Sequence, residues 1–288
     1  MNNQFNLVFL CVTLLAYLLL PNTDDLLDSS ASSTGGNSGG GVPCTWSGDD
    51  APRRADFCAS KRLAEMFRNV CTCHNPAPIT IKPRHRPQLD HIQHTPLLVM
   101  AANRPKYLYR SLHSVLNAFG VVKENIIVSI DGDFNDSAAV SNLFGLRTIQ
   151  TQPQGTKNAR ISQHYRRALN FTLNDEFKNA EYLIVLEDDL SVAPDFFVYF
   201  NWALDLFKID PTLYCVSAWN DHGMNHAVGG DIVVNRVEGM PGLGWAMSRS
   251  ILDELLPIWL PKERQTDWDL FLRKPSIRKG IVQVFRSQ

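Results

Sequence analysis

Three consecutive acidic residues, Glu187, Asp188 and Asp189, end an apolar stretch of the chain. Neighbouring carboxylates repel one another, so we expect a positive partner to offset their charge. A Mg²⁺ or Mn²⁺ ion that also holds a diphosphate suits this position, because such ions take one or two carboxylates and complete their coordination with phosphate and water oxygens. The alternatives are acids in a solvated loop or at a helix N-cap. The triplet predicts a metal site, and composition alone leaves those alternatives open.

Two further polar side chains follow predicted strands. Arg104 comes after the apolar Leu97–Ala102, and Asp131 lies at the end of the apolar Asn125–Gly132. An arginine in this position can pair with a phosphate, and an aspartate can accept a hydrogen bond from a base or a ribose. Each residue alone also fits a plainer role, a solvated surface charge for Arg104 and a turn residue for Asp131. Their shared position at strand ends favours a nucleotide site.

Alternating strands and helices must position these side chains. Short apolar runs predict buried strands, and apolar residues three and four positions apart predict helices. The strands are expected at Leu97–Ala102, Asn125–Gly132 and Tyr182–Leu190, and the helices at Lys61–Val70, Lys106–Phe119, Asn158–Asn170 and Asp195–Leu206. We therefore predict an α/β fold with a mainly parallel sheet and helices on both faces, in which ligands bind beyond the carboxyl ends of the strands.

The amino-terminal part predicts entry into the secretory pathway. Residues 1–20 contain the apolar run Leu7–Leu20, which is shorter than the roughly 20 residues that span a bilayer. A cleaved signal peptide and a short type II membrane anchor both remain open, and a buried core helix is disfavoured because a low-complexity spacer follows at 21–43. Either segment sends the rest into the lumen, where we expect a cysteine-bearing stem segment and linker at 44–93 and a main domain at 94–288.

Four cysteines, Cys44, Cys58, Cys71 and Cys73, lie close together in the stem segment. Cys71 and Cys73 are too close for the usual zinc-binding spacing, so two disulfides are expected in an oxidising lumen, with a connectivity that the sequence leaves open. Cys215 stands alone, and we expect its thiol to stay titratable or to form mixed disulfides.

Composition excludes several function classes. The chain is 44% hydrophobic and 20% charged, which is ordinary for a globular protein and excludes disorder throughout. The formal net charge of -1 and the pI near 6.7 do not favour nucleic acid or an anionic membrane surface as the main partner. Two sequons, beginning at Asn135 and Asn170, could carry glycans in the lumen.

Eight segments between about 94 and 280 form a recognisable series, in chain order NRPKYLYRSL, FGLRTIQ, KNARISQHY, VLEDDL, APDFF, LYCVSAWNDHG, MPGLGW and DWDLFLRKP. Through these segments the region resembles the β-1,2-N-acetylglucosaminyltransferases that act on mannose. It implies a nucleotide-sugar glycosyltransferase of the A-type fold, with UDP-N-acetylglucosamine as donor, Mn²⁺ as cofactor and inversion at the anomeric carbon. A Golgi membrane enzyme with a lumenal catalytic domain is the expected form.

The resemblance also implies roles for single residues. Arg104, Asp131 and His164 match the family's nucleotide contacts, Asp189 matches its metal ligand, and Glu187 and Asp188 are expected near the sugar. Without the resemblance His164 would be ambiguous, because a histidine on an amphipathic helix is more often a surface or core-edge residue than a ligand.

Asp269 matches the family's general base, which takes a proton from the acceptor hydroxyl. Asp267 is the local competitor, and either aspartate could instead cap the helix that follows. The glycines of MPGLGW permit close backbone approach, and Trp245 offers a flat wall for a sugar or packs in the core.

Three functions remain open from the sequence. The preferred function is a transferase whose acceptor is O-linked mannose on a protein. The second is a transferase that acts on the α-1,3-linked mannose arm of an N-glycan, and the third is a non-catalytic lumenal binding protein with the same fold. Family members continue beyond DWDLFLRKP with a further cysteine that pairs with the one at Cys215 and a loop that closes over the donor. Because IVQVFRSQ does not resemble that continuation, we expect the catalytic domain to be incomplete at its carboxyl end.

Overall fold

The computed structural model describes residues 44–79, 89–219, 234–237, 239–240, 242–278 and 282–286. The predicted targeting segment Leu7–Leu20 and the predicted spacer 21–43 lie outside these residues. Within them, no helix has both the length and the apolar character needed to span a bilayer. The described residues all belong to one compact unit.

A mixed sheet forms the centre of this unit. Its order in the described residues is β3-β2-β1-β4-β7-β5-β8-β6. The first four strands run parallel, whereas β7 is antiparallel to both β4 and β5, and β6 is antiparallel to β8. The strands are β1 (Leu97–Ala101), β2 (Ile126–Asp131), β3 (Arg147–Thr151), β4 (Tyr182–Glu187), β5 (Leu213–Ser217), β6 (Val234–Val237), β7 (Trp245–Ser248) and β8 (Val282–Arg286).

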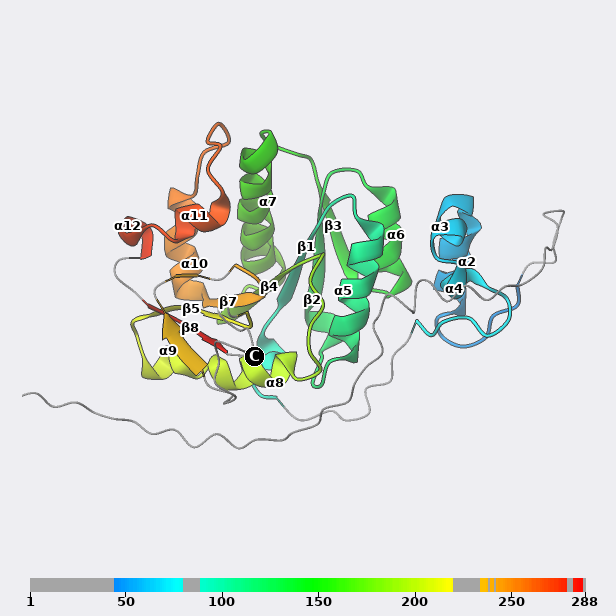
Figure 1. The fold of residues 1–288 in the computed structure, drawn as a ribbon, viewed down its shortest axis with the longest axis horizontal. Coiled ribbons are helices and arrows are strands. Elements are labelled where there is room, and N and C mark those ends of the chain that lie inside the picture. The colour runs from blue at the N-terminus through cyan, green and yellow to red at the C-terminus, as the bar shows by residue number, and fades with distance from the viewer. Residues whose placement is uncertain are drawn as a thin grey trace, which may run out of the picture. The chain divides into compact units, whose positions relative to one another are not determined.

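Helices cover both faces of the sheet (Figure 1). The helices are α2 (Ala51–Ala59), α3 (Lys61–Met66), α4 (Arg68–Cys71), α5 (Pro105–Asn117), α6 (Asn135–Leu143), α7 (Lys157–Phe171), α8 (Phe196–Ala203), α9 (Leu206–Ile209), α10 (Arg249–Leu255), α11 (Trp268–Leu272) and α12 (Pro275–Arg278). The described residues also contain three short 3-10 helices and one short π-helix. The 3-10 helices are η1 (Ile92–His94), η2 (Lys123–Asn125) and η4 (Leu256–Ile258), and the π-helix is η3 (Thr172–Glu176).

The alternation of side chains along β1 explains these two layers. Leu97 and Val99 pack in the cluster that includes α5, α6 and α8, whereas Leu98 and Met100 pack with α7, α10 and α11. A strand buried on both faces is a continuous apolar run, which is why β1, β2 and β4 could be predicted. The α/β fold with helices on both faces is confirmed.

Two elements between β2 and α7 escaped prediction. Strand β3 lies at the edge of the sheet and is half exposed, so its sequence RTIQT lacks an apolar run. Helix α6 has the sequence NDSAAVSNL, in which small and polar residues dilute the apolar spacing. The helix predicted at Lys61–Val70 is interrupted at Phe67, a buried residue outside helical geometry, and the helix predicted at Asp195–Leu206 ends at Ala203.

The cysteine-bearing segment is stapled by disulfides. Cys44 pairs with Cys73 and Cys58 with Cys71, which confirms the predicted pairing of these cysteines with one another and supplies the connectivity. Phe67 of this segment packs on Tyr109 of α5, with ring centroids 5.2 Å apart. The segment therefore shares the hydrophobic core of the larger domain.

Cys215 is a free cysteine on β5 that has no exposed surface. Burial raises the pKa of its thiol, because an apolar environment disfavours the thiolate. Cys215 is therefore unpaired, as expected from the sequence, but its burial in the folded protein opposes the titration and the mixed disulfides that were predicted for it.

Candidate active site

The ends of three neighbouring parallel strands bring the predicted site residues to one edge of the sheet. Ala101 of β1 lies in register with Ile130 of β2, and Met100 with Glu187 of β4. The residues that follow these strands therefore emerge side by side, as the carboxyl ends of parallel strands must. Arg104, Asp131 and the acidic triplet 187–189 share this edge.

Arg104 links the first strand to the acidic triplet. Its guanidinium donates to Asp189 Oδ2 at 2.9 Å and also to Asp188. Asp188 is buried and accepts a further hydrogen bond from the backbone N–H of Ala102 at 3.3 Å. Burial raises the pKa of Asp188, and the Arg104 charge opposes this effect. The positive partner that the triplet required is, in part, an arginine of the protein.

Tyr165 of α7 connects the triplet to the carboxy-terminal acids. Its hydroxyl donates to Glu187 Oε1 at 2.5 Å, and its ring stacks on Trp268 with centroids 4.1 Å apart. Burial, and then the negative charges of Glu187, Asp189 and Asp269, raise the pKa of Tyr165 well above its usual value. Trp268 precedes Asp269 in α11, so Tyr165 contacts both the triplet and the start of the helix that carries Asp269.

Asp269 itself occupies the first turn of α11. Its carboxylate pairs with Arg273 of the same helix at 3.2 Å, and about a quarter of the side chain, 28%, remains accessible. Arg273 is fixed in turn by donating to the backbone carbonyl of Met240 at 2.9 Å. Asp267 stands at the N-cap position of α11 but makes no capping hydrogen bond with its side chain.

The β2 side of the edge contains an ion-pair cluster. Asp131, nearly buried, accepts from Arg160 Nε at 2.5 Å and from Arg167 at 3.4 Å. Arg160 also donates to the backbone carbonyl of Asp131 at 2.6 Å. Both arginines lie on α7, the helix that carries His164, and the sequence analysis did not predict their role. They lie four residues before and three residues after His164, a spacing that places all three side chains on one face of a helix and could have indicated them.

His164 is a buried residue that forms a hydrogen bond with Ser129 of β2 at 2.8 Å. Its pKa is lowered to about 4, mainly by burial; the Asp131 charge opposes this effect, and the charges of Arg167 and Arg160 add to it. The imidazole is therefore neutral near pH 7. It belongs to the core edge of the site, next to Asp131.

The sequence matches the GNT-I family over residues 61–287. The chain belongs to the GNT-I family. It is also 34% identical over 198 residues to the α-1,3-mannosyl-glycoprotein 2-β-N-acetylglucosaminyltransferase of Arabidopsis thaliana. That alignment covers 64% of this chain and 43% of the relative, so the chain spans less than half the relative's length.

Solved structures resemble the GNT-I chain weakly. A mannosyltransferase from Pyrobaculum calidifontis, in complex with GDP-mannose and Mn²⁺, is 14% identical with a TM-score of 0.46 and covers 73% of this chain and 60% of its own. S. aureus TarS 1-349 is 12% identical with a TM-score of 0.47, over 67% of this chain and 58% of its own. These likenesses are too distant to bear on ligand or substrate.

The acidic triplet of this GNT-I chain fits a divalent metal bound with few protein ligands. The described residues contain no group of three or more His, Cys, Asp or Glu side chains arranged to hold a metal ion. The Asp189 carboxylate keeps 34% of its side-chain surface accessible, and Arg104 is the cation paired with the triplet. Carboxylate oxygens suit Mn²⁺, and a metal shared with phosphates needs only one or two of them.

Trp245 does not form a wall for a sugar. It lies on β7, is 1% exposed, and packs in the core against Trp268 with ring centroids 5.8 Å apart. The packing alternative is therefore the one the structure supports. Gly242 permits the close approach expected of this segment, because a Cβ there would lie 3.3 Å from the Trp268 ring.

Proposed function

We propose that this chain is an inverting glycosyltransferase that moves N-acetylglucosamine from UDP-N-acetylglucosamine, in β-1,2 linkage, to a terminal mannose. The observation that carries the proposal is the contact of Tyr165 with both Glu187, in the acidic triplet, and Trp268, which precedes Asp269 in α11. Membership of the GNT-I family supports it, and so does the name of the Arabidopsis relative.

The donor would bind across the edge formed by β2, β1 and β4. Asp131 and His164 would face the nucleoside, and Arg104 would exchange part of its contact with Asp188 and Asp189 for the diphosphate. Asp189 would hold Mn²⁺, whose positive charge stabilises the leaving diphosphate when bound. Glu187 and Asp188 would line the sugar, with Glu187 oriented by the Tyr165 hydroxyl.

Asp269 would act as the general base. An inverting transfer needs a carboxylate that removes the proton from the acceptor hydroxyl on the side opposite the leaving group. Asp269 is partly accessible and held by Arg273, so it can receive an acceptor without reorganising the buried carboxylates. The neighbouring stack of Trp268 on Tyr165 fixes the start of α11, and with it the direction of Asp269.

The acceptor we favour is O-linked mannose on a protein, and this preference rests on the local sequences NRPKYLYRSL and FGLRTIQ. The α-1,3-linked mannose of an N-glycan is the second candidate, because the Arabidopsis relative is named for it. Transfer rates to an O-mannosyl peptide and to a mannose-terminated N-glycan, measured side by side, distinguish the two. The disulfides agree with a lumenal enzyme attached to the Golgi membrane by its amino-terminal segment.

The deciding experiment compares two neighbouring aspartates. Asp269→Asn should lower turnover with a mannose-terminated acceptor by at least about a hundredfold, the scale for loss of a positioned base. Binding of UDP should be unchanged. Asp267→Asn is the matched control and should keep most of the turnover. Loss of turnover in Asp267→Asn alone would move the base two residues upstream, and transfer by both variants would refute the assignment. Wild-type protein that binds UDP without transfer would favour the non-catalytic alternative.

A further inference from the structure

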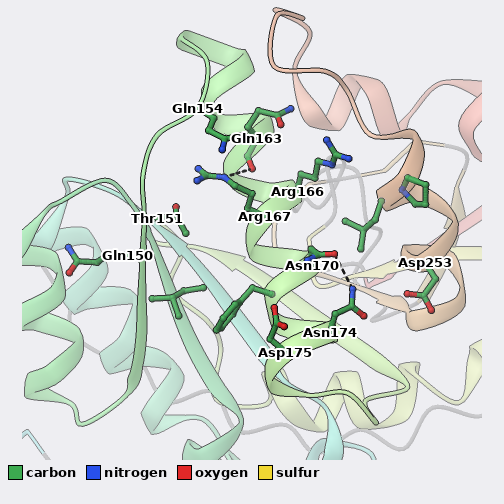
Figure 2. Close-up of a pocket in the computed structure, with 14 residues that line it drawn as sticks. Gln150, Thr151, Gln154, Gln163, Arg166, Arg167, Asn170, Asn174, Asp175 and Asp253 are labelled. Atoms are coloured by element: carbon green, nitrogen blue, oxygen red, sulfur yellow. Dashed lines mark hydrogen bonds between the residues drawn. The ribbon is translucent and has the colours of Figure 1, made fainter.

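A cavity with a mixed polar and apolar lining lies along α7. It has a volume of about 920 Å³ and is bordered by β3, by α7 and by the α10–η4 segment (Figure 2). None of the triplet's side chains lines it. Its lining is rich in side-chain amides, and these are Gln150, Gln154, Gln163, Asn170 and Asn174. The cavity is therefore not accounted for by the transfer site.

A relay of hydrogen bonds orients one of these amides. Arg249 donates to Asn174 Oδ1 at 2.6 Å and is itself fixed by the backbone carbonyls of Leu173 and Lys178. Because Asn174 Oδ1 faces the arginine, its Nδ2 faces Asn170 and donates to Asn170 Oδ1 at 3.0 Å. The relay leaves Asn170 Nδ2 as the free atom of that amide among the described residues.

Asn170 also begins the sequon Asn170-Phe171-Thr172. The Asn170 side chain is exposed at the last turn of α7 and lines the cavity. Thr172 is fully buried, and its hydroxyl has no hydrogen-bond partner among the described residues. A buried hydroxyl without a partner destabilises a fold, so packing alone does not explain a threonine at this position. A sequon is recognised on the nascent chain, before Thr172 is buried.

We propose that Asn170 is N-glycosylated and that the first sugar residues of its glycan lie in the cavity. Asn170 Nδ2 forms a bond to the anomeric carbon of a polyisoprenyl-diphosphate-linked oligosaccharide, the bond from that carbon to the diphosphate breaks, and the Nδ2 proton leaves as the diphosphate departs. Asn170 Oδ1 keeps its role as acceptor, so the hydrogen bond from Asn174 survives. The proposal requires entry into the lumen and is independent of the transfer reaction.

The lining matches a neutral oligosaccharide. Amide groups both donate and accept hydrogen bonds, as sugar hydroxyls require. Phe171 and Pro257 supply apolar surface for the C–H faces of a pyranose ring. The lining contains the negative charge of Asp175 as well as the positive charge of Arg166, and Arg167 already pairs with Asp131. The cavity therefore has no excess of one charge that would favour a charged ligand.

The second sequon provides an internal comparison. Asn135 is exposed at the first residue of α6, and Ser137 of its sequon is also buried without a hydrogen-bond partner in the described structure. Asn135 does not line the cavity. A glycan on Asn135 would therefore extend without this lining around it, whereas the glycan on Asn170 would be partly enclosed.

The test uses the full chain, expressed in eukaryotic secretory cells. Peptide mass spectrometry after enzymatic release, which converts a glycosylated asparagine to aspartate, should show most of the protein modified at Asn170. Thr172→Val should abolish the modification, and Thr172→Ser should preserve it. Thr172→Val keeps the side-chain shape and removes a hydroxyl that bonds to nothing in the described residues, so it should unfold at a temperature no lower than the wild type. Thr172→Ser loses a buried methyl group and should unfold at a slightly lower temperature, so loss of the glycan in Thr172→Val alone cannot be assigned to misfolding.

The cavity is tested by the rate of enzymatic glycan release. Release from Asn170 should be at least about tenfold slower in native protein than after denaturation, and Gln154→Ala should reduce that protection. Asn135, if modified, should show a smaller difference. Unmodified Asn170 would overturn the proposal, and the state of the disulfides in the same sample would show whether lumenal entry had also failed. Equal release rates in native and denatured protein would overturn the placement of the glycan in the cavity.

Discussion

The two ends of the candidate site treat negative charge in opposite ways. At the β2 end, one carboxylate, Asp131, pairs with two arginines, Arg160 and Arg167. At the other end, Asp188 and Asp189 pair with one arginine, Arg104, and Glu187 accepts a hydrogen bond from Tyr165. The arginines outnumber the carboxylate at the first end, and the carboxylates outnumber the arginine at the second end.

This difference predicts that one end of the sheet edge stabilises the fold and that the other binds ligands. A carboxylate that pairs with two guanidiniums of one helix helps to fix that helix, because removing the carboxylate leaves both guanidiniums without their partner. A set of carboxylates that lacks compensation attracts a cation, and burial already raises the pKa of Glu187 and Asp188. Substitutions at the Asp131 end should therefore change mainly the free energy of unfolding, and substitutions in the triplet should change mainly the binding of metal and donor.

The largest effect is expected from the same substitution made at each end. Asp131→Asn should lower the free energy of unfolding by about 3 kcal/mol, because it leaves two arginines of α7 without their carboxylate. Asp189→Asn should leave it nearly unchanged, since Arg104 keeps Asp188 and one repulsive charge is removed. Denaturant unfolding of both variants measures the contrast.

Equal destabilisation by these two variants would break the comparison, since both ends would then be structural. Chemical denaturation should be followed by a near-ultraviolet signal and a far-ultraviolet signal. Coincident transitions are needed for the two free energies to be compared.

The next effect concerns the pH dependence of stability at the Asp131 end. The pKa of His164 is lowered to about 4 in the folded protein, so its contribution is present above its unfolded value and is lost as the pH falls. Between pH 7 and pH 5, wild-type protein should lose about 2 kcal/mol more unfolding free energy than His164→Gln, with an unfolded histidine pKa near 6.5. Unfolding curves at both pH values give the difference, and parallel losses would mean that His164 is charged or accessible when folded.

A smaller effect is expected from metal at the triplet. Mn²⁺ should raise the affinity for UDP by about tenfold, or about 1.4 kcal/mol, because Asp189 should hold a metal that bridges the phosphates. Titration calorimetry with and without Mn²⁺ measures this. Asp189→Ala should remove the dependence, whereas Asp131→Asn, in protein that remains folded, should retain it. Metal-independent binding of UDP by the wild type would contradict the assignment of Asp189.

The smallest effect concerns the single arginine of the triplet. Arg104→Gln should lower the free energy of unfolding by about 1 kcal/mol or less, because the guanidinium is partly exposed and its pairs are screened. Mn²⁺ should restore part of the loss in the variant and add less to the wild type. A loss unaffected by Mn²⁺ would show that Arg104 acts through packing on Tyr107 instead of through charge.

Much of the fold was predictable because its signals are local. Strands β1, β2 and β4 are continuous apolar runs, since helices cover both faces of the sheet. Parallel strands place their ends on one edge, so Arg104, Asp131 and the triplet could be expected together before any coordinates. The clustered cysteines likewise predicted disulfides, although not their connectivity.

The sequence by itself therefore determined the layers of this protein and the edge at which its polar residues meet. Only the tertiary structure decided which charged side chains form ion pairs, because Asp131 of β2 contacts Arg160 and Arg167 of α7. It also decided that Trp245 is buried and that Tyr165 joins Glu187 to Trp268. These contacts join residues far apart in the chain, and a local pattern of polarity contains no information about which distant side chains the packing of helices on the sheet will bring together.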